Sequence, residues 1–330
     1  MTTMLMPSDL VSLEEWTGAD IHRVLDHAAD VKRRLADTPK LDVLNGRSVV
    51  LLFEKPSLRT RVSFDVGIAK LGGHSVYLEH IQSRIGEREA IKDYAKNLER
   101  WCDCLVARTF EHGTIAELAE HASVPVINAL SDLEHPCQAL ADLLTLSEAC
   151  GELDGASLAY VGDGNNVCHA LMLACSAAGV DLVVVTPPGF EPKYTMIERA
   201  HERAVASGAT LTVSSDLAAI AGASAVYTDT WVSMGQADTA GKRLEAFRGY
   251  QITPEVMAIA GGDARFMHCL PAHRGVEVVD AVIDAPESIV YDQAENRMHA
   301  QNALLSLLLD PNAHMPPHAN TDTNTNAGER

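Results

Sequence analysis

Short apolar runs alternate with longer segments of helical spacing, and this alternation constrains the fold of the 330-residue chain more than any other feature. A strand buried in a parallel sheet is apolar on both faces, whereas a helix covering that sheet is apolar every three or four positions. The strand-like runs are Ser48–Phe53, Ser75–Leu78, Cys104–Arg108, Val124–Ile127, Ser157–Val161, Asp181–Thr186, Thr210–Val213, Ala225–Thr228, Arg265–His268 and Ile289–Tyr291. The pattern predicts an α/β protein whose parallel sheets are covered by helices on both faces.

Helical segments separate these strands, and one break in the rhythm divides the chain. The expected helices are Leu58–Leu71, Ala90–Trp101, Thr114–His121, Pro136–Cys150, Val167–Ala178, Pro192–Ser207, one after Pro254, and Ala294–Leu309. The stretch GELDG at residues 151–155 interrupts the alternation, which then restarts. We therefore expect two α/β domains, residues 1–150 and 151–293, joined by interdomain helices.

Two segments fit neither pattern. Residues 236–249 are polar with charges of both signs, and a long loop of this kind inside an α/β domain is often a lid over a site. Residues 311–330 are rich in Pro, Asn, Thr and His with almost no large apolar side chain, which is typical of a disordered tail.

The charge balance excludes several classes of function. A net charge of −19 argues against nucleic-acid binding and against docking on an anionic membrane. No apolar run approaches the ~20 residues that span a bilayer, and the N-terminal residues resemble neither a signal nor a transit peptide. Seven scattered cysteines suggest a reducing cytoplasm, and Cys102 with Cys104 forms too short a motif for a zinc site. We expect no metal.

The segment FEKPSLRTR at residues 53–61 has the features of an anion site. It follows a predicted strand and opens a helix, so free backbone N–H groups would lie beside the Ser57 and Thr60 hydroxyls and the Arg59 guanidinium. Residues 53–111 contain ten Lys and Arg and nine Asp and Glu, so this stretch has no net negative charge, unlike the rest of the chain. A serine helix cap with surface arginines is the simpler alternative.

A histidine, His135, lies in the loop after the last predicted strand of the first sheet. His135 precedes a proline, which disfavours helical backbone there, and it projects from the loop after the strand that ends near Ile127. Ligands of open α/β sheets bind at such carboxyl edges. His135 is therefore a candidate hydrogen-bond donor or proton-transfer group, although a structural histidine is an equally simple explanation.

The motif VGDGNNV at residues 161–167 invites a dinucleotide-binding interpretation. The third glycine of that fingerprint is missing, and the next strand ends in Thr-Pro-Pro instead of the acid that holds a ribose. A nicotinamide dehydrogenase is thus a weak alternative. The turn would instead present Asn166 to a polar ligand.

Two later strand ends carry further candidates. Asp229, in TDTWVSMG, is placed to pair with an ammonium group and Ser233 to bond a carboxylate, unless the segment is only an Asx turn. Cys269, in MHCLPAHRG, is a nucleophile, a ligand contact or a buried thiol; covalent catalysis is the weakest of the three because no partner base is evident. Arg297 lies in the first turn of the last predicted helix.

Taken together, these segments closely resemble the ornithine carbamoyltransferase family, from about Glu14 to Leu309. SLRTR at residues 57–61 and HPCQ at 135–138 match the carbamoyl-phosphate motifs of carbamoyltransferases generally. Asp229 with SMG at 233–235, and HCLP at 268–271, match the narrower ornithine-type pattern.

The resemblance implies an enzyme that uses carbamoyl phosphate and L-ornithine, with no metal or organic cofactor. It implies homotrimers, or multiples of trimers, with active sites at subunit boundaries. It also implies that the last helix, residues 294–309, returns to the first domain. The implied carbamoyl-phosphate contacts are Ser57, Leu58 (through its backbone N–H), Arg59, Thr60, Arg108, His135, Gln138, Cys269, Leu270 and Arg297. The implied ornithine contacts are Asn166, Asp229, Ser233 and Met234, and the implied catalytic residues are Arg59, Arg108, His135 and Cys269.

Two positions depart from the family pattern. Leu58 stands where many members have Thr, so a hydroxyl contact there is lost. Arg84 stands where members have Gln before an apolar-Gly pair, here Ile85-Gly86. This loop reaches the neighbouring subunit's site in the family, so we expect Arg84 to meet the phosphate there.

Related activities stay open at this level. A transferase for N-acylornithine or putrescine would have less use for Asp229 and the SMG turn. A non-catalytic paralogue would be expected to lose phosphate or ornithine contacts. In this sequence all of these contacts except the Arg84 position look intact. A role in arginine metabolism follows for an ornithine-using enzyme.

Overall fold

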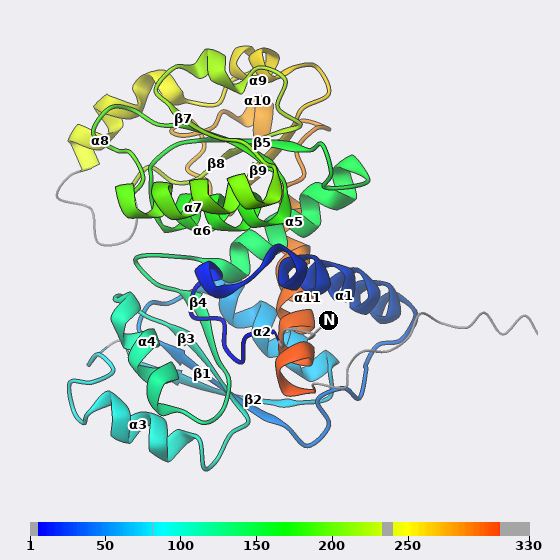
Figure 1. Cartoon of the computed structure of the whole chain (residues 1–330), viewed down its shortest axis with the longest axis vertical. Coiled ribbons are helices and arrows are strands. Elements are labelled where there is room, and N and C mark those ends of the chain that lie inside the picture. The colour runs from blue at the N-terminus through cyan, green and yellow to red at the C-terminus, as the bar shows by residue number, and fades with distance from the viewer. Residues whose placement is uncertain (1–5, 81, 233–239, 311–330) are drawn as a thin grey trace, which may run out of the picture.

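The computed structural model describes residues 6–80, 82–232 and 240–310, which form two α/β lobes (Figure 1). The first lobe contains a four-stranded sheet in the order β2-β1-β3-β4, and the second a five-stranded sheet in the order β7-β6-β5-β8-β9. Every strand pair in both sheets is parallel. This confirms the predicted fold class.

The strands of the first sheet are β1 (Ser48–Phe53), β2 (His74–Glu79), β3 (Cys104–Arg108) and β4 (Val126–Leu130). Its helices are α2 (Leu58–Lys70), α3 (Ile91–Leu98), α4 (His112–His121) and α5 (Pro136–Cys150). All residues of β3 are buried, as expected of a strand covered on both faces. Helix α5 begins with Pro136 and ends at Cys150; the residue that follows it, Gly151, has a φ of 89°, which suits only glycine well.

The strands of the second sheet are β5 (Ser157–Val161), β6 (Asp181–Val185), β7 (Leu211–Ser214), β8 (Ala225–Thr228) and β9 (Arg265–His268). Its helices are α6 (Asn166–Ala178), α7 (Tyr194–Ser207), α8 (Ala240–Phe247), α9 (Pro254–Ala260) and α10 (Asp280–Ile283). Short 3₁₀ turns occupy Leu13–Glu15, Leu217–Ile220 and Arg248–Tyr250.

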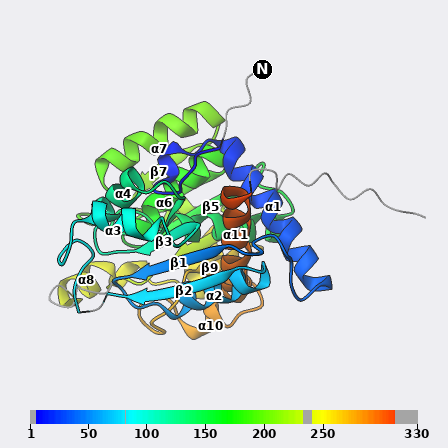
Figure 2. The same ribbon diagram turned by 90° about the horizontal axis from the view of Figure 1, so that it is seen from below.

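Helices α1 (Gly18–Asp37) and α11 (Val290–Leu309) connect the ends of the chain to the first lobe. Helix α11 packs against α5, α1 and α2, and it also contacts β9 of the second lobe. Figures 1 and 2 both show α11 beside α1. The last helix therefore links the two sheets, so side chains on it can reach residues from both lobes.

Three local predictions need correction. Ile289–Tyr291 is not a strand: only an isolated bridge joins Phe266 to Ser288, and the helical hydrogen bond from Gln293 N to Ile289 O starts α11. Three apolar residues are too few to distinguish a strand from a helix start. Residues 240–247 are the helix α8 and not a loop, since Phe247 is fully buried. The sequence prediction also omitted α1, which a reciprocal Thr17–Asp20 capping box opens.

In the described part of the chain, the helices are too short or too polar to span a bilayer. The predicted tail at 311–330, and residues 236–239 of the predicted lid, lie outside the described residues.

Candidate active site

A polar hollow of about 430 Å³ lies between the two lobes. The first lobe contributes Lys55 and Asp132, and the second contributes Asn166, Lys193 and Arg243 among others. The hollow lies beside loops that follow the carboxyl ends of parallel strands from both sheets, which is where open α/β folds bind ligands.

Three guanidinium groups gather beside the start of α2. Ser57 caps this helix by accepting a hydrogen bond from Thr60 N. The Thr60 hydroxyl is contacted by Arg297 Nη2 at 3.2 Å and by Arg108 Nη1 at 3.5 Å. Burial, followed by the charges of Arg297 and Arg59, lowers the pKa of Arg108 to about 9. Such a cluster of like charges favours a bound anion.

The predicted residues His135 and Gln138 complete this cationic pocket. Gln138 Oε1 accepts a hydrogen bond from Arg297 Nη1. His135 is buried, and its Nδ1 has no hydrogen-bond partner. Burial, with the charges of Arg297 and two further arginines, lowers the pKa of His135 well below 6.5. The imidazole is therefore neutral at pH 7 and offers a free hydrogen-bonding atom.

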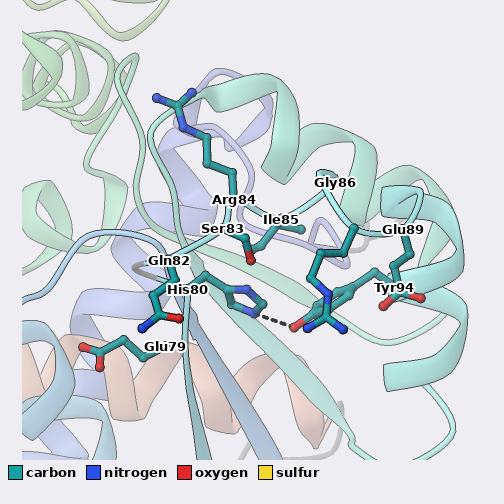
Figure 3. Close-up of a pocket in the computed structure, with 10 residues that line it drawn as sticks. Glu79, His80, Gln82, Ser83, Arg84, Ile85, Gly86, Glu89 and Tyr94 are labelled. Atoms are coloured by element: carbon teal, nitrogen blue, oxygen red, sulfur yellow. Dashed lines mark hydrogen bonds between the residues drawn. The ribbon is translucent and has the colours of Figure 1, made fainter.

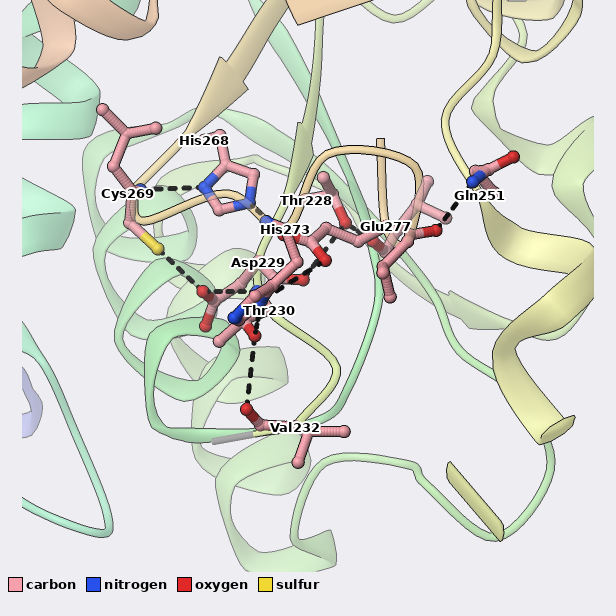
Figure 4. A network of polar contacts seen from close by, with 12 residues as sticks. Thr228, Asp229, Thr230, Val232, Gln251, His268, Cys269, His273 and Glu277 are labelled. Carbon is pink, nitrogen blue, oxygen red and sulfur yellow. Dashed lines mark hydrogen bonds and ion pairs between the residues drawn. The ribbon is translucent and has the colours of Figure 1, made fainter. Parts of the chain in front are cut away.

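Asp229 and Cys269 meet on the opposite side of the cleft (Figure 4). The Cys269 thiol donates to Asp229 Oδ1 at 2.9 Å, and Asn165 Nδ2 donates to Asp229 Oδ2 at 2.8 Å. Burial, and next the Asp229 charge, raise the pKa of Cys269 well above 9. Cys269 is thus a protonated thiol, which argues against a thiolate nucleophile. Asp229 stays available to a cationic ligand.

A buried histidine and glutamate hold the loop that carries Cys269 (Figure 4). His268 Nδ1 accepts from Leu270 N at 2.8 Å, and its Nε2 lies 3.2 Å from Glu277 Oε1. Potential metal-ligand atoms of Asp229, His268 and Cys269 lie within 4.8 Å of one another. Both nitrogens of His268 and the thiol are already engaged in hydrogen bonds, so this set is internally satisfied without a cation.

The two halves of the site are close enough to interact. The charges of Cys269 and Asp229 both act on the pKa of Arg59, which burial lowers overall. Asn166 Nδ2 donates to the Ser131 carbonyl at 2.6 Å across the lobes, and His169 Nδ1 bonds the Leu133 carbonyl at 2.9 Å. Asn166 is therefore at the cleft but holds the loop before His135.

The side chains of two predicted residues lie outside the pocket. Leu58 is the first residue of α2, and its side chain is 75% exposed. Arg84 pairs with Glu111 at 2.9 Å and stacks over Phe110. Figure 3 shows Arg84 pointing away from the hydrogen-bonded His80 and Tyr94, which line a hollow of about 710 Å³.

Sequence reasoning missed several groups at the cleft. Arg243 on α8 pairs with Asp163 at 2.8 Å, a contact between residues 80 positions apart that no local motif could indicate. The buried Glu134 accepts hydrogen bonds from Ser12 and Leu13, and burial raises its pKa to about 7. Glu134 thereby fixes the loop beside His135. The predicted residues Ser233 and Met234 lie outside the described part of the chain.

The glycine-rich turn before α6 has a packing explanation. A methyl group at Gly164 would lie 2.1 Å from the backbone nitrogen of Pro192, so only glycine permits this approach. Asn165 Oδ1 caps α6 by accepting from Val167 N and Cys168 N. The motif is explained without a nucleotide.

The fold and the cleft define a two-lobed α/β enzyme with a cationic pocket facing a carboxylate–thiol pair. Comparison with known proteins agrees. Residues 8–148 match the family model "Aspartate/ornithine carbamoyltransferase, carbamoyl-P binding domain", and residues 154–308 match "Aspartate/ornithine carbamoyltransferase, Asp/Orn binding domain".

Individual relatives support the same assignment. An ornithine carbamoyltransferase of Anoxybacillus flavithermus is 46% identical over 93% of this chain and 98% of its own. One from Shewanella oneidensis is 49% identical over 90% of this chain and 98% of its own. The solved ornithine carbamoyltransferase of Pyrococcus furiosus covers 93% of this chain and 98% of its own, with 44% identity and a TM-score of 0.89. The chain therefore belongs to the aspartate/ornithine carbamoyltransferase family and is a carbamoyltransferase.

Proposed function

We propose that this enzyme transfers the carbamoyl group of carbamoyl phosphate to the δ-amine of L-ornithine, giving L-citrulline and phosphate. The observation that carries the proposal is the arrangement of the site: Arg108 and Arg297 converge on the Thr60 hydroxyl in one lobe, and Asp229 and Cys269 form a hydrogen-bonded pair in the other. One pocket has the charge for a phosphate ester and the other has the charge for an amino acid's ammonium group. Two relatives whose alignments cover 90% or more of this chain are named ornithine carbamoyltransferase.

In the proposed complex, the cationic pocket holds carbamoyl phosphate. Ser57, Arg59, Thr60, Arg108 and Arg297 bind the phosphate end, with a backbone contact from Leu58. Gln138 and Leu270 bind the carbamoyl group, and the neutral His135 donates a hydrogen bond to its oxygen. The guanidinium groups then stabilise the charge that develops on the leaving phosphate.

Ornithine occupies the second lobe's side of the cleft. Asp229 pairs with its α-ammonium group, while Asn166, Ser233 and Met234 hold the rest of the amino-acid head. The δ-amine then points toward Cys269 and the carbamoyl carbon. The protonated thiol supplies a polar contact near the attacking nitrogen without competing as a nucleophile.

The reaction needs a neutral amine, which is scarce at pH 7. An amine of pKa about 10.4 is unprotonated in roughly one molecule in 10³, which costs about 4–5 kcal/mol. Holding both reactants in line can offset about 7–11 kcal/mol of the barrier. As the new C–N bond forms and the C–O bond to phosphate breaks, the proton released from the nitrogen passes to the departing phosphate.

We expect citrulline formation to depend on pH and on the amino-acid head. kcat/KM for ornithine should rise between pH 6 and 9, by up to about tenfold per unit, as free ornithine loses its proton. Putrescine and N-acetylornithine should react at least about a hundredfold less efficiently, since they lack the free α-ammonium group that Asp229 binds. A colorimetric citrulline assay with the three amines tests this; a flat pH profile or equal use of putrescine contradicts the proposal.

We further propose that the chain forms homotrimers, or multiples of them, in a reducing cytoplasm. All seven cysteines are free thiols. Helix α2 exposes a stripe of Leu58, Val62 and Val66, which are 75%, 48% and 41% exposed. Such an apolar stripe on a lobe surface favours contact with another subunit. The trimer would bring Arg84 into a neighbour's cationic pocket.

This assembly is tested by sedimentation and by a surface variant. The wild type should sediment at three times 35.5 kDa, or a multiple of it. Val62→Asp should dissociate it and lower activity more than tenfold, whereas the same change at the exposed Val205 on α7 should not. Arg84→Ala should weaken phosphate binding without dissociation. A fully active monomer would overturn the proposal.

We also propose that citrulline formation serves arginine biosynthesis. A relative from Pyrococcus furiosus, 45% identical over 94% of this chain, is named an anabolic ornithine carbamoyltransferase. Measuring the rate in both directions tests it: the rate of citrulline formation should exceed that of its phosphorolysis at equal substrate concentrations.

A further inference from the structure

A buried carboxylate with no assigned role lies behind the cationic pocket. Asp142, two turns into α5, is 1% exposed. Its Oδ1 accepts hydrogen bonds from Gln138 Nε2 and Gln293 Nε2, both at 2.7 Å. Its Oδ2 makes no regular hydrogen bond, although the nearby Tyr227 hydroxyl lowers the pKa of the carboxyl. Burial raises its pKa to about 7. Such a group is costly to bury, so stability alone does not account for it.

The two hydrogen bonds determine which way each glutamine amide faces. An amide has a donor end and an acceptor end, and Asp142 takes the donor end of both. The acceptor oxygen of Gln138 is thereby turned to Arg297 Nη1. The acceptor oxygen of Gln293 is turned to His268 N, at 2.9 Å.

These contacts form one continuous chain across the active site. It runs from His268, next to Cys269, through Gln293 on α11 and Asp142 on α5 to Gln138 and Arg297. Arg297 then contacts Thr60 at the start of α2. Asp142 is the acceptor that both glutamines share, and it lies between the half-site for each substrate.

We propose that Asp142 is a positioning residue that fixes the amide orientations of Gln138 and Gln293, and so aligns the carbamoyl-phosphate pocket with the Cys269 loop. This inference rests on the proposed function for the identity of the substrates. The group acts through hydrogen-bond geometry, so one acceptor oxygen at this position is sufficient. An asparagine can supply that oxygen, and its NH₂ group, in place of Oδ2, can donate to the nearby Tyr227 hydroxyl.

The test compares two replacements of similar size. Asp142→Leu removes the acceptor, so both amides can turn, and kcat/KM for carbamoyl phosphate should fall at least about 50-fold. Asp142→Asn keeps an acceptor and should retain activity within about tenfold of wild type. Equal losses in the two variants, or an active leucine variant, would overturn the proposal.

A double-mutant cycle separates positioning from a structural role. If Asp142 acts through the glutamines, Asp142→Leu should cost less than about threefold in a Gln138→Ala, Gln293→Ala background. Multiplicative losses in the triple variant would refute the mechanism. Gln293→Leu keeps Asp142 and tests the second arm if the leucine variant does not fold. Gln293→Leu should lower kcat, while its KM for carbamoyl phosphate changes less than about threefold. A raised KM with an unchanged kcat would contradict the proposal.

The wild-type citrulline assay distinguishes failure of the proposed function from failure of the positioning role. If the wild type forms no citrulline, the substrate assignment fails and the variants are compared by their binding of inorganic phosphate instead. Asp142→Leu should then weaken phosphate binding through the released Gln138 and Arg297, and Asp142→Asn should not. Unchanged phosphate affinity in the leucine variant would reject the positioning role independently.

Discussion

Replacing Asp229 with Asn is expected to lower kcat/KM for ornithine by about a thousandfold or more. Removing one partner of a buried ion pair typically costs about 3–5 kcal/mol, because the other charge is left unpaired. Asp229 also accepts hydrogen bonds from Asn165, Cys269 and the backbone N of Thr230. The single acceptor oxygen of an asparagine cannot serve all three and an ammonium group as well.

Steady-state citrulline formation, together with phosphate titration, measures this effect. Phosphate affinity should stay within about twofold of wild type, because the guanidinium pocket is unchanged. Asp216→Asn is the matched control: Asp216 caps the 3₁₀ turn Leu217–Ile220, where asparagine caps equally well. An Asp229→Asn enzyme within tenfold of wild type would show that another group binds the ammonium.

The elements predicted best are those whose sequence signals are local. The strands Ser48–Phe53 and Cys104–Arg108 and the helix Pro136–Cys150 have their predicted bounds. Continuous apolar runs define such buried strands, and proline and glycine mark the two ends of that helix. The predicted start of α11 was wrong because Ile289 has two roles. Its N–H donates to the Phe266 carbonyl, as a strand residue would, and its carbonyl accepts the first hydrogen bond of the helix.

The site could be predicted as far as its residues belong to motifs. Ser57, Arg59, Thr60 and His135 follow strands whose carboxyl ends share an edge, so their convergence could be expected. Other contacts arise only in three dimensions. Gln293 and Asp142 are 151 positions apart, and no motif or hydrophobic periodicity in the sequence around either residue indicates that the two are in contact. Such pairs depend on how α11 packs against α5.

Arg108→Leu is expected to weaken phosphate binding by at least a hundredfold while stabilising the anion-free protein. Arg108 and Arg297 are both buried, and no carboxylate forms an ion pair with Arg108 among the residues that the structure describes. The lowered pKa of Arg108 reflects burial and then repulsion from Arg297 and Arg59. A leucine removes both costs, so the free energy of unfolding without phosphate should rise.

Thermal unfolding with increasing phosphate distinguishes these effects. An anion that binds the folded state stabilises it by about 2.7 kcal/mol at one hundred times its Kd. The wild-type Tm should therefore climb with phosphate, whereas the Tm of Arg108→Leu should start higher and stay nearly flat over the same range. Arg100→Leu, an exposed change in the same lobe, should keep the wild-type slope. If Arg108→Leu keeps that slope too, the phosphate site does not depend on this guanidinium; if it also unfolds at a lower temperature, the charge repulsion inferred from the pocket is not a cost to the free protein.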